Sequence, residues 1–117
     1  MTRILWTQKQ DVGPGQRFGH AMAYDSIRSV TVLFGGGNSI DFFGDTWEWD
    51  GENWTQMEDV GPSPRSDFAM AFDAERKQTL LFGGRPNVFN QEVRFSDTWG
   101  WDGQAWRHPG ARRARLT

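Results

Sequence analysis

The sequence contains no cysteine and only two histidines among its 117 residues. Without cysteine, disulfides, thiol catalysis and cysteine-based zinc or copper sites are excluded. The histidines, His20 and His108, share no motif with a nucleophile and no metal-ligand spacing. We therefore expect a chain that is not an enzyme and that uses neither a metal nor another cofactor.

Long apolar runs are also missing. No stretch approaches the roughly 18 residues that cross a bilayer, and residues 1–6 lack the apolar core of a signal peptide. The apolar fraction of 37%, which leaves out 14 glycines, is close to that of a globular domain. We expect a soluble, folded chain that does not contact membranes and that is, by default, cytoplasmic.

Excess positive charge is confined to the C-terminal end. Residues 104–117 carry four arginines and no acid, so the rest of the chain has a net charge of −6 against −2 for the whole. Such a body is not typical of a nucleic-acid-binding protein, and arginines without interleaved aromatics more often form a solvated end. We expect no nucleic-acid partner.

A repeat occupies most of the chain. Trp6-Thr7-Gln8 returns 48 residues later as Trp54-Thr55-Gln56, and Asp45-Thr46-Trp47 returns 52 residues later as Asp97-Thr98-Trp99. Trp106 begins a third copy that stops almost at once. Repeats of this length indicate stacked identical units that cannot bury their faces alone.

The first half of each unit predicts two strands. Bulky and small residues alternate from Phe18 to Tyr24, which is typical of a strand with one thick and one thin face. The polar segment Asp25–Ser29 predicts a turn, and the β-branched and aromatic run Val30–Phe34 predicts the next strand.

The second half predicts another hairpin. Thr46–Trp49 alternates again, and Asp50-Gly51 separates it from a fourth strand at Asn53–Met57. Asp-Gly between two such runs indicates a type I′ turn, which needs positive φ at its centre. No segment has a sustained helical period, so each unit is predicted to be a four-stranded antiparallel meander in an all-β fold.

Several motifs resemble the kelch repeat family. These are the double glycines after apolar runs (Val32–Gly36 and Leu80–Gly84), the aromatics downstream (Trp47 and Trp99) and the Pro-x-Pro-Arg segment Pro62–Arg65. In that family each repeat is one blade of a β-propeller, and six or seven blades close a ring. The resemblance implies two four-stranded antiparallel kelch-type propeller blades.

The resemblance covers residues 6–106 and divides the chain into four parts. The parts are an N-terminal outer strand at 1–10, blades at 11–57 and 58–108, and a basic tail at 109–117. Because two blades leave two open faces, we expect them to close a propeller by oligomerisation. A homo-oligomer of three chains, giving six blades, fits the family best, and dimers and tetramers are the alternatives.

The two ends of the chain compete for one place in this ring. The segment Leu5, Trp6, Thr7 and Gln8 copies the fourth strand of the first blade, whereas the segment after Trp106 soon meets a proline. We therefore predict that the N-terminal strand of one chain completes the second blade of a neighbour. The alternative keeps Trp106 in its own blade.

The loops between the second and third strands differ most between the copies. They span 37–44 and 85–96 and are unusually apolar for exposed connections. They are interpreted either as packing against the adjacent blade or as a contact surface for a protein or ligand. The candidate binding residues are Ile40, Phe42, Phe43, Arg85, Asn87, Phe89, Gln91, Glu92, Arg94 and Phe95.

The other polar and aromatic residues are interpreted as structural. His20 is predicted to be a packed histidine, and the repeated aspartates at 25/73, 45/97 and 50/102 are expected to bond nearby backbone. The repeated tryptophans are expected to form the core. The predicted function is a non-catalytic binding or scaffold module that self-associates; the alternatives are a carbohydrate-binding lectin-like propeller and a fragment of a kelch-type enzyme such as a sugar isomerase.

Overall fold

The chain folds into two four-stranded antiparallel sheets. A computed structural model describes residues 13–57, 60–88 and 92–108. The strands of the first sheet, in pairing order, are β1 (Ala21–Asp25), β2 (Val30–Phe34), β3 (Thr46–Trp49) and β4 (Trp54–Gln56). Those of the second are β5 (Ala69–Asp73), β6 (Gln78–Phe82), β7 (Thr98–Trp101) and β8 (Trp106–Arg107). The predicted all-β fold with two four-stranded meanders is confirmed.

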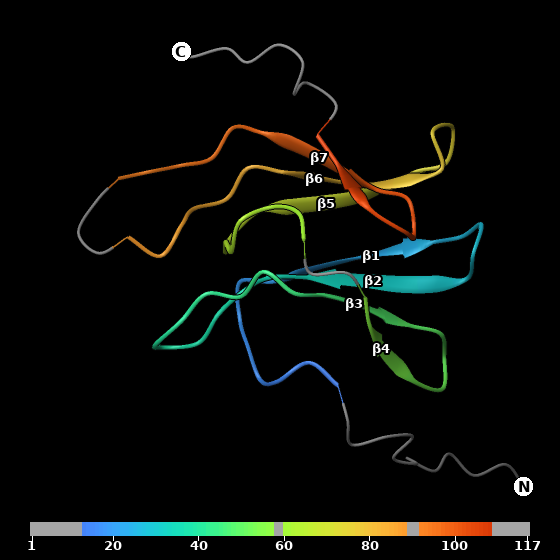
Figure 1. Ribbon diagram of the computed structural model, residues 1–117, viewed down its shortest axis with the longest axis horizontal. Helices are drawn as coiled ribbons and strands as arrows, with labels where there is room; N and C mark the ends of the chain where they lie inside the picture. The colour runs from blue at the N-terminus through green and yellow to red at the C-terminus, as the bar shows by residue number, and fades with distance from the viewer. Residues whose placement is uncertain (1–12, 58–59, 89–91, 109–117) are drawn as a thin grey trace, which may run out of the picture.

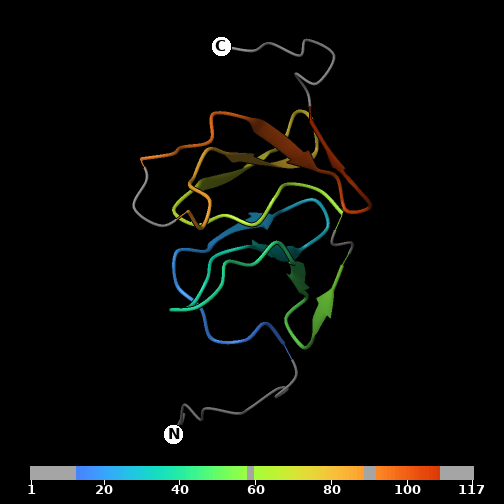
Figure 2. The ribbon, with the colours of Figure 1, turned by 60° about the vertical axis from the view of Figure 1, so that its left-hand side comes forward.

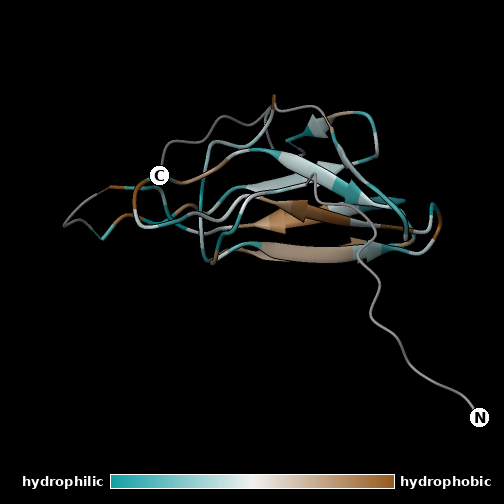
Figure 3. Cartoon of the chain, turned by 90° about the horizontal axis from the view of Figure 1, so that it is seen from below, coloured by the Kyte–Doolittle hydropathy of each residue, from teal (hydrophilic) through white to brown (hydrophobic). Residues whose placement is uncertain are grey.

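The sheets lie one above the other, and this arrangement is clear in both ribbon views (Figures 1 and 2). In Figure 1 the four hairpin turns extend to the right, and the loops that connect β2 to β3 and β6 to β7 extend to the left. The most apolar strands lie near the middle of the view in Figure 3, whereas other strands are pale or hydrophilic and parts of the loops are apolar. Among the described residues no helix is long and apolar enough to span a membrane.

The first strand begins later than the alternation predicts. Phe18 lies outside β1 and makes only an isolated bridge with Gly37, because Gly19 has a φ of +73° that interrupts the extended backbone. The strand therefore starts at Ala21. Phe18 is 59% exposed, so it does not pack on the strand face where the prediction placed it.

The Asp-Gly hairpins form as predicted, but the turn type differs. Positive φ occurs at Gly51 (+102°) and Gly103 (+98°) but not at the preceding aspartates. A type I′ turn needs positive φ at both central residues, so Asp-Gly does not form one here. Instead, Asp50 Oδ1 accepts hydrogen bonds from the backbone N–H groups of Glu52 and Asn53, both at 2.8 Å. The aspartate therefore caps the turn from just before its glycine.

Trp106 occupies the fourth place of the second sheet. In β8 it pairs with Trp101, so the chain fills with its own residues the position that was predicted for a neighbour's N-terminal strand. Within one chain Trp106 thus follows the alternative, and the exchange of N-terminal strands between chains stays a prediction. Indole burial explains the outcome, because Trp106 is 8% exposed and its Nε1 donates to Thr46 Oγ1 at 2.8 Å. The predicted strand-exchange residues Leu5, Trp6, Thr7 and Gln8 lie outside the described residues.

Candidate functional site

The contact between the two sheets has an aromatic centre. Phe34 of β2 is fully buried, and its ring meets Phe68 edge-on at 5.6 Å and Trp106 edge-on at 5.3 Å. Val32 and Leu81, both fully buried, belong to the same cluster. The face of the first sheet that carries Phe34 thus packs on the face of the second sheet that carries Leu81 and Trp106. We call this packing the inter-sheet contact.

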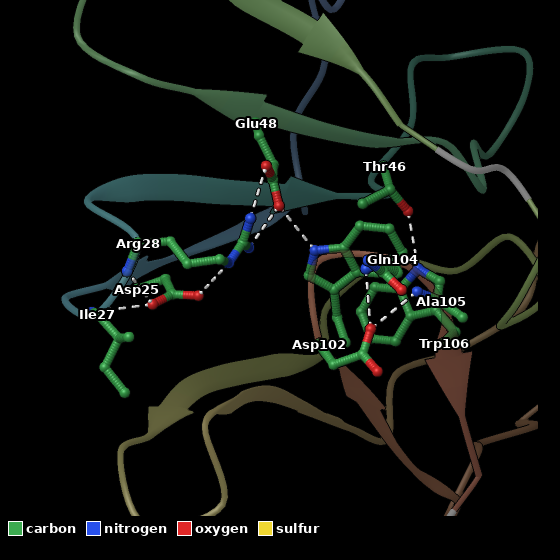
Figure 4. Close-up of polar contacts among 10 residues, drawn as sticks. Asp25, Ile27, Arg28, Thr46, Glu48, Asp102, Gln104, Ala105 and Trp106 are labelled. Atoms are coloured by element: carbon green, nitrogen blue, oxygen red, sulfur yellow. Dashed lines mark hydrogen bonds and ion pairs between the residues drawn. The ribbon is translucent and has the colours of Figure 1, made fainter.

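A buried polar group lies beside the aromatic centre. Glu48 accepts a hydrogen bond from the Trp101 indole at 2.8 Å and pairs with Arg28 at 2.6 Å (Figure 4). Arg28 also pairs with Asp25 at 2.9 Å. The hydrogen bond to Glu48 raises the pKa of the Arg28 guanidinium against the opposing effect of burial. Arg28 therefore provides the counter-ion for a carboxylate that is buried between the sheets.

The outer face of the second sheet carries the residues that are equivalent, in the repeat, to those of the first sheet in the inter-sheet contact. Because side chains alternate along a strand, Phe82 and Leu80 point away from the first sheet, and their cross-strand partners Thr98 and Gly100 share that face. Phe82 follows Phe34 at the repeat distance but is 53% exposed. The equivalent apolar face is thus covered by the other sheet in the first unit and open to solvent at Phe82 in the second.

The outer face of the first sheet carries the residues that are equivalent to those of the second sheet in the inter-sheet contact. Leu33 pairs with Met22 and Trp47, so these three side chains lie on the face opposite Phe34. Trp49 holds the position of Trp101 on this face. Met22 is 51% exposed, whereas its counterpart in the inter-sheet contact, Met70, is half-buried against the core. The molecule thus ends in two faces that complement each other as the two sides of its own inter-sheet contact do.

The predicted loop residues are brought together only in part. Asn87 Nδ2 donates to the Ile40 carbonyl at 3.3 Å, and the Arg85 guanidinium lies 5.2 Å from the centre of the Phe42 ring. Arg85 also pairs with Asp67 at 2.9 Å. These contacts join the loop of one sheet to that of the other, so packing between neighbouring units accounts for Phe42 and Arg85, whereas the side chains of Ile40 (76%) and Asn87 are exposed.

Phe43 and Phe95 are held within their own sheets. The Arg17 guanidinium lies 4.4 Å from the Phe43 ring centre, and the Arg65 guanidinium lies 3.9 Å from that of Phe95. Each phenylalanine covers a half-buried ion pair. They are therefore framework residues, and the sequence interpretation of a contact surface does not extend to them.

The remaining loop candidates are either exposed or outside the described residues. Glu92 and Arg94 are exposed, and the only contact of the Arg94 side chain among the described residues is with the adjacent Val93 carbonyl at 3.0 Å. Phe89 and Gln91 lie outside the described residues. A shallow cleft of 390 Å³ lies beside the 37–44 loop and is lined by Phe42, Phe43, Gly44, Asp45, Pro62 and Pro64.

Two aspartates act differently from the prediction of local backbone bonding. Asp45 accepts from Arg17 at 2.7 Å and from the Trp47 indole at 2.7 Å, and Asp97 does the same with Arg65 and Trp99. These partners are side chains, so the prediction for this pair was wrong. It is confirmed for Asp25, Asp50, Asp73 and Asp102, whose carboxylates accept from backbone N–H groups of the following residues.

Buried ion pairs hold these two carboxylates ionised. Burial by itself would raise the pKa of Asp45, but the hydrogen bonds from Arg17 and Trp47 outweigh it, so the pKa lies below its ordinary value. For Asp97, burial is likewise outweighed by the bonds from Arg65 and Trp99, and its pKa is lowered too. In each sheet the arginine thereby fixes the start of the third strand.

Acid should therefore destabilise the fold. A carboxyl whose pKa is lowered by folding contributes stability above its unfolded pKa of about 3.9 and loses it as pH falls through the folded value. We expect the free energy of unfolding, measured with urea, to be constant from pH 7 to about pH 5 and to fall below about pH 4. Asp45→Asn with Asp97→Asn should lower it at pH 7 and flatten this acid slope. An unchanged slope would show that these pairs do not contribute.

Two groups were not identified as partners from the sequence. Glu48 was missed, although the second copy has Gly100 at the equivalent position and such a difference between copies indicates a residue with a separate role. Arg17 and Arg65 were missed although they repeat at the 48-residue distance. In both cases the repeat pointed to the position but not to its partner, because the partner is far away in the sequence.

Four of the described tryptophans are engaged in packing or in hydrogen bonds to aspartates, and the described residues show no metal cluster. Trp101 and Trp106 are buried in the inter-sheet contact, while the Trp47 and Trp99 indoles donate to aspartates. Among the described residues no group of three or more His, Asp or Glu side chains could hold a metal ion. His20 is half-buried, and its Nδ1 has no hydrogen-bond partner within the described part of the chain. The sequence matches no family model and no curated protein.

Proposed function

We propose that this chain is a non-catalytic scaffold module that self-associates through its two outer faces. The observation that carries the proposal is that Phe34 is fully buried in the inter-sheet contact, whereas its repeat counterpart Phe82 is 53% exposed on the outer face. Met22 and Tyr24, on the opposite outer face, are 51% and 56% exposed. Packing one copy's second sheet on the next copy's first sheet would repeat the inter-sheet contact.

The energetics favour this packing. Covering a large apolar side chain contributes roughly 1.5–3 kcal/mol, and open faces of this kind on a small protein mark contact sites. The two faces differ from each other, so the contact is head-to-tail and must close into a ring or grow into a filament. We infer a closed β-propeller of the kelch type, with three chains supplying six blades.

The resemblance to kelch repeats favours six blades, and rings of four or eight blades from two or four chains are the alternatives. Such a ring does not require strand exchange, because β8 already holds the fourth place of the second blade. It would gather the loops between second and third strands on one side. These loops would present exposed residues such as Ile40 and Glu92 to a protein or ligand.

Placing a charge on one outer face should prevent assembly. Phe82→Asp would put a carboxylate where the next copy's first sheet packs, and an unpaired buried charge opposes association strongly. We expect the full-length chain to sediment at three times the chain mass and the variant to sediment as a single chain.

The matched control is Ile27→Asp. Ile27 is 52% exposed, close to the exposure of Phe82, but lies in the turn between β1 and β2 and on neither outer face. This variant should assemble like the original chain. A monomer at every concentration, or equal loss of assembly in both variants, would refute face-to-face packing.

A further inference from the structure

The outer face of the second sheet lacks the acceptor that Glu48 provides in the inter-sheet contact. Glu48 is 7% exposed and accepts from the Trp101 indole, and Arg28 neutralises its charge. At the equivalent place the second sheet has Gly100, which has no side chain. A neighbour packed on this face would present Trp49, the counterpart of Trp101, at that place.

Gln78 fills the space that Gly100 leaves. A Cβ on Gly100 would collide with Oε1 and Cδ of the Gln78 side chain, which therefore lies across the glycine. Gln78 is at the start of β6, on the same face as Leu80 and Phe82. Its counterpart in the first sheet is Val30, which has no polar atom. The side-chain acceptor is thus on the third strand in the first unit (Glu48 of β3) and on the second strand in the second unit (Gln78 of β6).

The surrounding charges changed with it. In the first sheet Arg28 pairs with both Glu48 and Asp25, but its counterpart Arg76 pairs with Asp73 and is 70% exposed. A neutral amide oxygen needs no such counter-ion, whereas a buried carboxylate does. Gln78 beside Gly100 therefore replaces the carboxylate of Glu48 with a neutral acceptor, and Arg76 pairs with Asp73 alone.

We infer that Gln78 Oε1 accepts a hydrogen bond from the Trp49 indole of the next copy, and that this bond sets the register between copies. The inference rests on the proposed self-association. It makes Gln78 a specificity-determining residue of the junction, since an indole N–H buried without an acceptor is costly. The partner is a second copy of this chain, recognised through one amide and one indole.

Gln78→Val should weaken association between full-length chains about 10-fold, the usual effect of leaving one buried donor unpaired. Valine is the residue of the first sheet at this place, so folding should be retained, as checked by circular dichroism. Gln104→Val, which changes an exposed glutamine in the β7–β8 turn, is the matched control and should associate normally. Equal association of Gln78→Val and the original chain would overturn the inference.

Two further variants separate the hydrogen bond from a merely structural role. Adding Gly100→Glu to Gln78→Val rebuilds the first sheet's set beside Arg76 and should restore association. In a Trp49→Phe background, Gln78→Val should cause no additional loss, because the donor is gone. A full additional loss there would refute the pairing. If the original chain is monomeric, the proposed self-association itself fails; if it assembles and Gln78→Val has no effect, only the role of Gln78 fails.

Discussion

Replacing Phe34 with alanine is expected to lower the free energy of unfolding by about 3–5 kcal/mol, the usual range for a buried phenylalanine. Phe34 is fully buried and its ring contacts both Phe68 and Trp106 of the other sheet. Removing the ring would therefore open a cavity between the two sheets as well as within one. Urea unfolding followed by tryptophan fluorescence measures the change.

Phe82→Ala is the comparison that makes this result specific. Both phenylalanines follow a leucine and precede two glycines, but Phe82 is 53% exposed. In dilute solution, where the chains are separate, its replacement should cost less than about 1 kcal/mol, as surface changes usually do. At concentrations where the chains assemble, the cost should rise. If Phe34→Ala and Phe82→Ala cost the same in dilute solution, the packing of the two sheets described above is wrong.

Arg65→Ala is also expected to have a large effect, up to about 3–5 kcal/mol, because it removes a buried guanidinium and leaves a half-buried carboxylate without its partner. The Arg65 side chain is 1% exposed and makes a two-pronged pair with Asp97 at 2.7 and 3.0 Å. It also donates to the Gly83 carbonyl at 3.0 Å and covers the Phe95 ring. One arginine therefore fixes the end of β6, the start of β7 and the loop between them.

Arg76→Ala provides the control for Arg65. It removes an arginine of the same sheet that pairs with Asp73 but whose side chain is 70% exposed, and because exposed ion pairs contribute little, the loss should be much smaller than for Arg65→Ala. Arg65→Lys should recover only part of the loss, since an ammonium cannot make the two-pronged pair. A loss below about 1 kcal/mol for Arg65→Ala would mean that the carboxylate finds water instead.

Strand positions could be predicted from the sequence because they depend on neighbours along the chain. Val30–Phe34 and Thr46–Trp49 form the strands that their residue patterns indicate. The start of the first strand was predicted too early because Gly19 has a positive φ. Glycine adopts positive and negative φ about equally well, so the sequence alone does not decide between them. Gly19 lies against Ser66 and Asp67 in the segment before β5, and its carbonyl accepts from the Asp67 N–H at 2.9 Å, contacts that alternation within one strand cannot reveal.

The candidate site was less predictable, because its residues meet only across strands and sheets. Arg17 lies 28 residues before Asp45, and Glu48 lies 53 residues before Trp101. Repetition identified the aspartates as structural but could not say which cation they face. The predicted loop cluster was drawn from composition, and the structure divides it into framework residues such as Phe43 and exposed ones such as Glu92.

The sequence by itself determined an all-β chain of two equivalent four-stranded units, because alternation, glycine turns and Asp-Gly hairpins act over a few residues. Only the tertiary structure decided which copy of each repeated position is covered. Phe34 and Phe82 have nearly the same local sequence, yet one is fully buried and the other 53% exposed. Burial depends on what lies across the sheet face, and a second sheet lies over Phe34 alone.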